Sequence, residues 1–346
     1  MIKRYLFTIL NILVFATLTF AQKEKGLEVI NKRGIEAHLA FLASDALEGR
    51  EAGKNSGRVA AEYIKAVLLE TGVKPFYDSY FQHFEAYSPA REKEKDFQVN
   101  PDSIALYKQE RAYRRLNLQN VLGYIEGEKK DEYVIIGAHY DHVGIDELLV
   151  GDRIYNGADD NASSVAAVLQ VVKGYAATGN KPARSIIFAF WDGEEVNYLG
   201  SEYFVENFKK LESIVAYINL DMIGREGFLP VFYPQFKIPK VKESTTAQDK
   251  TFYQLYTREL EKASNQLVKD ANTYKLDVVA KPSVIEHKSR GSDNLPFSLR
   301  SVPILWFFTG LHPDYHTPVD ETETINFDNL TNITKVVYLS LWNLSQ

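Results

Sequence analysis

Tyr133-Val-Ile-Ile-Gly-Ala-His-Tyr-Asp-His142 is an apolar, β-branched run that ends abruptly in imidazoles and a carboxylate. A continuous apolar run of this kind is typical of a strand buried on both faces of a sheet. After a short variable segment comes Asn156-Gly-Ala-Asp-Asp-Asn161, which leads into an Ala- and Leu-rich stretch with the composition of a helix. The stretch therefore predicts polar side chains where a buried strand ends and a helix begins.

Three later segments repeat this pattern of an apolar strand followed by an acid or a base. They are Ser185–Trp191 before Asp192-Gly-Glu-Glu195, Ile214–Leu220 before Asp221, and Val302–Phe308 before Thr309-Gly-Leu-His-Pro-Asp-Tyr-His316. Nearly continuous apolar strands that alternate with helical stretches predict an α/β fold with a mixed, mainly parallel central sheet flanked by helices. Because ligands of such sheets lie beyond the carboxyl ends of the strands, we expect the polar loops to converge on one rim.

The rest of the chain predicts helices and one insertion. Gly34–Ala43 and Ser56–Glu70 carry apolar residues at three- and four-residue spacing, which is typical of amphipathic helices. The polar loop Ser44–Gly53 between them either contributes to a functional rim or simply connects two helices. Residues 228–282 begin with spaced prolines, and the apolar residues from Phe252 to Leu267 give the remainder a helix-like pattern. We expect a single domain over residues 22–346, with an insertion at about 228–282 that covers the rim.

The N-terminus predicts export. Lys3 and Arg4 precede an apolar run from Tyr5 to Phe20, and this run is short for a membrane span. We therefore expect a cleaved signal peptide over residues 1–21, a periplasmic or secreted protein and no stable membrane insertion, with a retained anchor as the alternative. The chain has no cysteine, so an exported protein of this size would depend on its core or on metal rather than on disulfides.

The charge balance argues against some partners. The formal net charge is −6, and loss of Lys3 and Arg4 with the signal peptide would make it −8. An acidic chain without a basic stripe does not predict binding to nucleic acid or to an anionic membrane. The sequence does not predict the oligomeric state.

The polar groups on the expected rim favour metal. Carboxylates that gather there would repel one another or need costly desolvation, and a cation removes that problem. Imidazoles and carboxylates without a thiolate suit Zn²⁺, with Mn²⁺ or Co²⁺ as substitutes. The set is too large for one catalytic zinc ion, which takes three protein ligands and a water, but it suits two ions that share a carboxylate. The candidate residues are His139, Asp160, Glu194, Glu195, Asp221 and His316.

Five motifs occur in one order along the chain: Gly137-Ala-His-Tyr-Asp-His142, Asn156-Gly-Ala-Asp-Asp-Asn-Ala-Ser163, Asp192-Gly-Glu-Glu195, Asn219-Leu-Asp-Met222 and Tyr315-His-Thr-Pro-Val-Asp320. In this order and at these separations they resemble the M28 family of co-catalytic zinc aminopeptidases. Ser44–Arg50 also resembles the N-terminal part of exported bacterial members, so the likeness covers nearly all of the mature chain. The resemblance implies the α/β sandwich of these enzymes and peptide substrates.

The resemblance implies a metal-binding role for five of these residues. His139 and Asp221 would hold one zinc ion, while Glu195 and His316 would hold the other. Asp160, the second of two adjacent aspartates, would bridge the two ions.

It also implies roles around the metals. Glu194 would be the general base, and Asp141 would orient the imidazole of His139. Tyr315 either donates a hydrogen bond to the substrate carbonyl or simply packs. The family further implies a cis peptide bond between Asp160 and Asn161.

Other polar residues near the motifs receive no metal. His142 and His312 are interpreted as structural hydrogen-bonding groups, and Asp159 as a residue that supports the ligands or begins the helix. The segment from Ser292 resembles a family Ser-Asp-His loop but ends in Asn294, so it is not assigned a ligand.

The predicted function is that of an exported di-zinc exopeptidase which removes N-terminal residues from peptides with metal-activated water and a Glu base. Two alternatives use the same site: a zinc acyltransferase resembling glutaminyl cyclase, and a carboxypeptidase or other amide hydrolase. A non-enzymatic binding module would predict eroded ligands, whereas all six candidate positions fit the family pattern.

Overall fold

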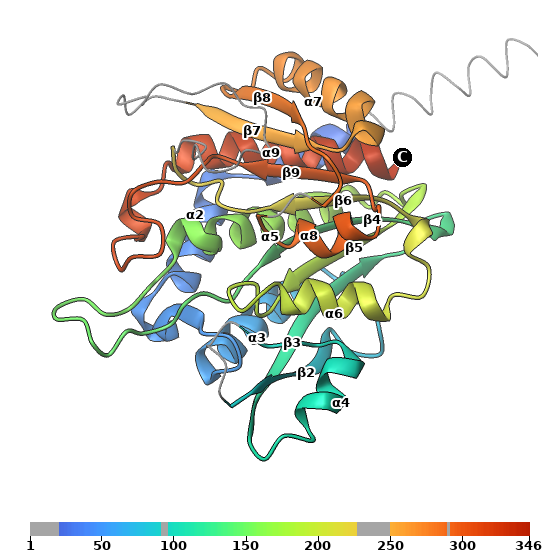
Figure 1. Cartoon of the computed structure of the whole chain (residues 1–346). Coiled ribbons are helices and arrows are strands. Elements are labelled where there is room, and N and C mark those ends of the chain that lie inside the picture. Colours follow the sequence, from blue (N-terminus) through green and yellow to red (C-terminus); the bar gives the residue numbers. More distant parts are fainter. Residues whose placement is uncertain (1–20, 91–95, 227–249, 289–290) are drawn as a thin grey trace, which may run out of the picture.

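The computed structural model describes residues 21–90, 96–226, 250–288 and 291–346, and its centre is one nine-stranded sheet (Figure 1). The strands are β1 (Lys74–Pro75), β2 (Phe81–Pro89), β3 (Tyr113–Ile125), β4 (Lys129–His139), β5 (Arg184–Trp191), β6 (Ile214–Leu220), β7 (Thr251–Tyr256), β8 (Val279–Val284) and β9 (Ile304–Phe308). Their order is β1-β3-β5-β4-β6-β9-β7-β8, and β2 pairs with β3.

Helices pack on both faces of this sheet (Figure 1). Val134, Ile136 and Ala138 of β4 share a core with the helices of one face, whereas Ile135 belongs to a second core on the other face. This two-sided burial explains why β4 is apolar without alternation. The first core takes residues from α2 (Lys32–Leu42), α3 (Asn55–Glu70), α5 (Ser164–Thr178), α7 (Glu261–Thr273) and α9 (Phe327–Ser345), and the second from α6 (Leu199–Asn207) and α8 (Asn294–Leu299); α4 (Pro101–Tyr107) lies beside β2.

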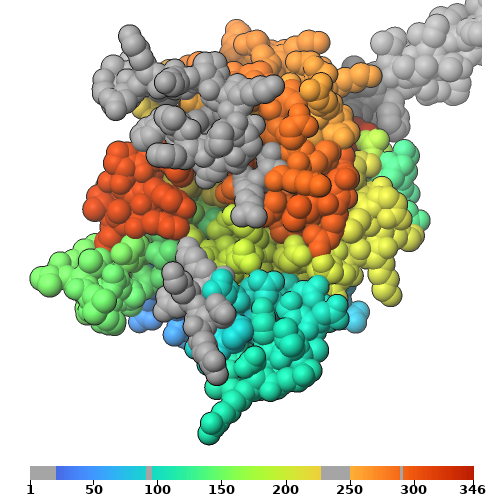
Figure 2. All heavy atoms as spheres, viewed as in Figure 1, coloured from blue at the N-terminus to red at the C-terminus, as the bar shows by residue number. Residues whose placement is uncertain are grey.

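The four central strands confirm the predicted α/β fold. β5, β4, β6 and β9 are parallel, and their register places His139 opposite Trp191 and Gly137 opposite Asn219. The carboxyl ends of these strands therefore lie at one edge. Figure 2 shows that the loops after β4 (green) and after β9 (red-orange) reach the same face of the molecule.

One element prediction was wrong. Phe252 to Tyr256 belong to a strand, β7, and not to a helix; the helix α7 begins only at Glu261. All six residues of β7 are buried: Phe252 and Tyr256 belong to the core on one face of the sheet and Tyr253 and Leu255 to the core on the other, so its apolar residues show no strand alternation. β7 pairs with β9 on one side and β8 on the other. The described part of the expected insertion, from residue 250, therefore extends the sheet. Its proline-containing part lies outside the described residues.

The expected signal peptide also lies outside the described residues, apart from Ala21. Among residues 21–90, 96–226, 250–288 and 291–346, no helix combines the length and the apolar character that crossing a membrane requires.

Candidate metal centre

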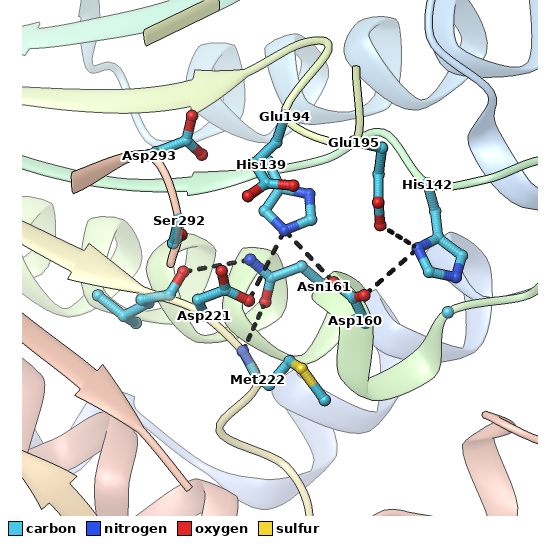
Figure 3. A network of polar contacts seen from close by, with 12 residues as sticks. His139, His142, Asp160, Asn161, Glu194, Glu195, Asp221, Met222, Ser292 and Asp293 are labelled. Atoms are coloured by element: carbon cyan, nitrogen blue, oxygen red, sulfur yellow. Dashed lines mark hydrogen bonds and ion pairs between the residues drawn. The ribbon is translucent and has the colours of Figure 1, made fainter. Parts of the chain in front are cut away.

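Two clusters of side chains meet at the carboxylate of Asp160 (Figure 3). Asp160 lies in the turn Ala158–Ser163, directly before α5. Its Oδ1 is 3.4 Å from Nε2 of His139, whereas its Oδ2 is 3.1 Å from Nε2 of His316 and 3.7 Å from Nδ1 of His142. The two oxygens of one carboxylate thus face two different groups of donors.

The His139 cluster consists of His139, Glu194 and Asp221, whose donor atoms lie within 4.8 Å of one another. Each residue follows a parallel strand: His139 ends β4, Glu194 follows β5 and Asp221 follows β6. Nε2 of His139 is 3.7 Å from Oδ1 of Asp221, and both side chains are buried. Glu194 is partly exposed.

The His316 cluster consists of His142, Glu195 and His316, together with the shared Asp160. Oε1 of Glu195 is 3.0 Å from Nε2 of His316 and 3.0 Å from Nδ1 of His142. The sequence predicted a structural role for His142, but the residue lies among the candidate ligands.

Burial and mutual repulsion raise the pKa of carboxylates in the His139 cluster. Burial raises the pKa of Glu194 well above its usual range; His139 opposes this shift, and Glu195 and Asp221 add to it. Burial also raises the pKa of Asp221, and a hydrogen bond and attraction from His139 only partly offset it. These carboxylates therefore need more positive charge than one imidazole supplies.

In the His316 cluster the imidazoles outweigh burial. Burial and Asp160 would raise the pKa of Glu195, but hydrogen bonds with His142 and His316 hold it at about 2. Burial would lower the pKa of His316, yet its hydrogen bonds to Asp160 and Glu195 raise it to about 10. In this cluster His142 and His316 thus balance the negative charge that a metal cation would otherwise balance.

The donor set fits a divalent metal. Across the described part of the chain, the ion pairs of Asp160, Glu195 and Asp221 are all with histidine. Nitrogen and oxygen donors without thiolate suit zinc. The donor atoms are 3.0 to 3.7 Å apart. These distances bracket the roughly 3.3 Å between ligand atoms of a tetrahedral zinc ion whose bonds are about 2.0 Å long.

Asp141 lies beside His139 but orients it through the backbone. Nδ1 of His139 is 3.1 Å from the Asp141 carbonyl oxygen and 3.8 Å from its carboxylate, beyond hydrogen-bonding distance. The carboxylate instead accepts from the backbone N–H groups of Glu194 (3.0 Å) and Glu195 (3.3 Å). It therefore positions the loop that supplies one residue to each cluster.

Asn161 holds the loop that carries Asp221. Its Nδ2 donates to the carbonyl of Leu220 (3.2 Å), and its Oδ1 accepts from the N–H of Met222 (3.1 Å). These contacts fix the backbone on both sides of Asp221. The peptide bond between Asp160 and Asn161 is cis, as the family resemblance implied.

Asp320 holds the backbone of the shared aspartate. Its carboxylate accepts from the N–H groups of Asp159 (3.0 Å) and Asp160 (3.0 Å). Oδ1 of Asp159 accepts from the N–H of Gly224 and the hydroxyl of Ser163, and Asp159 belongs to neither cluster.

Arg50 is a positioning residue that the sequence did not reveal. Its buried guanidinium donates to the carbonyls of Tyr140 (2.9 Å), Asn156 (2.6 Å), Gly157 (3.0 Å) and Leu42. It therefore ties the loop after β4 to the segment that leads to Asp160. The Ser44–Gly53 loop is thus more than a connection between two helices.

A small pocket borders the His139 cluster. Its lining among the described residues includes the apolar side chains of Met222, Trp306, Phe308 and Leu311 beside the carboxylates. Tyr315 also lines it; 37% of this residue is exposed, and its ring stacks on His316 with centroids 3.9 Å apart.

His312 and Asp293 lie outside both clusters. Nε2 of His312 is 3.4 Å from Asp159, and Asp293 accepts a hydrogen bond from Ser201 (2.6 Å). Burial raises the pKa of Asp293 to about 7 against the attraction of His139. Neither residue is a candidate ligand by geometry.

Fold and site together define an α/β protein with a candidate divalent-metal centre at the carboxyl edge of its parallel strands. The model of peptidase family M28 matches residues 120–341, and the chain belongs to this family.

Individual relatives agree with this assignment. A glutamate carboxypeptidase 2 homolog of Caenorhabditis elegans is 29% identical over 236 residues, which cover 63% of this chain and 29% of the relative. The chain therefore spans less than a third of that relative's length.

Solved structures show the same fold at low identity. An aminopeptidase from Aneurinibacillus sp. strain AM-1 superposes with a TM-score of 0.64 at 16% identity, covering 94% of this chain and 96% of that one. The Porphyromonas gingivalis glutaminyl cyclase gives a TM-score of 0.63 at 18% identity, with 91% and 99% covered. The fold alone therefore does not separate a peptidase from a cyclase.

Proposed function

We propose that the protein is an exported metallo-aminopeptidase that uses two zinc ions to hydrolyse the N-terminal peptide bond of peptides. The observation that carries this proposal is the position of Asp160, whose two oxygens face two sets of donors. His139 and Asp221 would hold one ion, and Glu195 and His316 the other. Mn²⁺ or Co²⁺ would be chemically acceptable substitutes.

The residues around the ions divide the work of hydrolysis. Zinc bound here would lower the pKa of a water molecule and polarise the scissile carbonyl. Glu194, next to His139 and at the pocket, takes the proton of the attacking water and returns it to the leaving amine. The carboxylate of Asp141 accepts a hydrogen bond from the backbone N–H of Glu194 and so positions this base. Tyr315, which lines the pocket, would donate a hydrogen bond to the carbonyl oxygen.

The pocket favours an amine over a carboxylate at the bound end of the peptide. Asp160, Glu194 and Asp221 line it, and the described lining residues include no lysine or arginine that would pair with a C-terminal carboxylate. Its apolar wall of Met222 and Trp306 suits an apolar N-terminal side chain. We therefore propose aminopeptidase action on peptides that begin with a hydrophobic residue.

Peptides with free and acetylated N-termini test the direction of cleavage. An aminopeptidase releases the first residue from the free peptide and spares the acetylated one, whereas a carboxypeptidase cleaves both. A peptide that begins with Gln tests the cyclase alternative, because cyclisation releases ammonia and leaves the peptide bonds intact. Activity that survives both chelation and Glu194→Gln would exclude the proposed mechanism.

Export rests on the N-terminal sequence alone, where Lys3 and Arg4 precede the apolar run. Fractionation of the producing cells, with sequencing of the mature N-terminus, tests it. A protein found in the cytoplasm with Met1 retained would contradict this part of the proposal.

A further inference from the structure

His142 occupies a position that hydrogen bonding alone does not explain. The residue is 1% exposed, and its Nδ1 lies 3.0 Å from Oε1 of Glu195 and 3.7 Å from Oδ2 of Asp160 (Figure 3). Its ring faces that of His316, with centroids 5.5 Å apart and planes at 72°. A single hydrogen bond to Glu195 would require only the first of these contacts.

The donor atoms around Nδ1 are spaced like the ligands of one metal ion. The separations are 3.0, 3.0, 3.1 and 3.7 Å among Nδ1 of His142, Oε1 of Glu195, Oδ2 of Asp160 and Nε2 of His316. These values bracket the roughly 3.3 Å edge of a tetrahedron with zinc bonds of about 2.0 Å. The four atoms come from four different segments of the chain, so their convergence is not a local sequence effect.

The chain also holds the ring of His142 from behind. The N–H of His142 donates to the carbonyl of Arg50 (3.2 Å), and the neighbouring residue Glu51 forms a parallel bridge with His142. Gly157 lies against the far edge of the ring: a Cβ there would be 2.5 Å from Cδ2. The same Cβ would be 2.1 Å from the carbonyl oxygen of Asp160, so glycine leaves room both for the ring and for the turn that carries Asp160.

The two clusters differ in access to the pocket. His139, Asp160, Glu194 and Asp221 line it, whereas His142, Glu195 and His316 are absent from its described lining. Among the described residues, the pocket therefore meets the His316 cluster only through the shared Asp160.

We propose that His142 is the fourth protein ligand of the ion in the His316 cluster, bound through Nδ1. That ion would then have a closed set of Asp160, Glu195, His316 and His142. The other ion would keep three protein ligands, namely His139, Asp221 and the shared Asp160, and one open position. This is the pattern of catalytic zinc sites. This inference rests on the two-metal site of the proposed function.

NMR of the protein with ¹⁵N-labelled histidine and bound ¹¹³Cd²⁺ tests the assignment without measuring activity. Of the seven histidines in the chain, three should show coupling between cadmium and a ring nitrogen. His139 and His316 should couple through Nε2, and His142 alone through Nδ1. His142→Asn should remove the Nδ1 coupling and leave the two Nε2 couplings. His312→Asn, a matched change of a buried histidine outside the clusters, should preserve all three.

The wild-type spectrum by itself decides the question, so a variant that fails to fold does not block the test. Two couplings, both through Nε2, would overturn the role of His142 while leaving the two-metal site intact. No coupling at any histidine would overturn both the inference and the proposed function.

Discussion

The His139 and His316 clusters share one carboxylate but differ in what surrounds them. The His139 cluster borders the pocket and contains the partly exposed Glu194. The His316 cluster has two imidazoles against Glu195 and lies outside the described lining of the pocket. In the proposed two-metal site, the His139 cluster would therefore meet the substrate, and the His316 cluster would hold its ion with the larger share of imidazole.

The largest effect is expected where the two clusters meet. Asp160→Ala removes the carboxylate that faces both, so the protein should lose both metal ions and its hydrolytic activity should fall to background. Metal analysis after dialysis, together with a peptide assay, measures this. Asp159→Ala is the matched control, since Asp159 lies in neither cluster, and it should retain at least one ion. Equal metal loss in both variants would contradict the bridging role.

A change confined to the His139 cluster should affect chemistry but not metal content. Glu194→Gln keeps the shape of the side chain and removes its capacity to accept a proton, so kcat should fall by about 10² to 10⁴-fold. The metal content should remain that of the wild type. A variant that retains wild-type kcat would remove Glu194 from the mechanism.

A change confined to the His316 cluster should have the opposite signature. His142→Asn should weaken binding of one ion by more than about 100-fold, since outer partners of metal ligands typically contribute 10 to 100-fold. Excess zinc should restore most of kcat, because Glu194 and His139 are untouched. Chelator competition and kcat at rising zinc concentration measure both. Undiminished affinity for both ions would contradict the ligand role of His142 and would leave the two clusters with the same number of protein ligands.

The smallest effect is expected from a residue that serves both clusters indirectly. Asp141→Asn leaves an amide with one acceptor oxygen where the carboxylate accepts from the N–H groups of Glu194 and Glu195. Affinity for each ion should fall by about 10 to 100-fold. Titration of the metal-free protein with zinc measures the two steps. An effect on one step only would show that Asp141 supports a single cluster.

The sequence predicted the central strands and their shared rim well, because burial on both faces leaves a local signature. An apolar run such as Ile214–Leu220 that ends in Asp221 shows both the strand and the position of its polar residue. The same burial on both faces explains the wrong prediction at β7. Phe252, Leu255 and Tyr256 are all buried there, and their spacing is also that of residues on one face of a helix.

The missed site residues depend on partners that are distant in the sequence. His142 contacts Glu195, which is 53 residues away in the sequence, and Glu195 contacts His316, which is a further 121 residues away. No local pattern therefore distinguishes His142 from a structural histidine. Asp320 accepts from backbone N–H groups that lie 160 and 161 residues upstream. Backbone groups are the same at every position, and a sequence therefore carries no mark of which ones a carboxylate will bind.

Arg50 indicates that the metal centre depends on residues that precede the region matched by the family model. The family match starts at residue 120, yet Arg50 supplies donors to buried carbonyls at Tyr140, Asn156 and Gly157. A fragment trimmed to the matched region would leave each of these carbonyls unpaired at a cost of about 1 to 3 kcal/mol. Transplanting the matched region into another scaffold should therefore fail to reproduce the metal centre unless the segment around Arg50 moves with it.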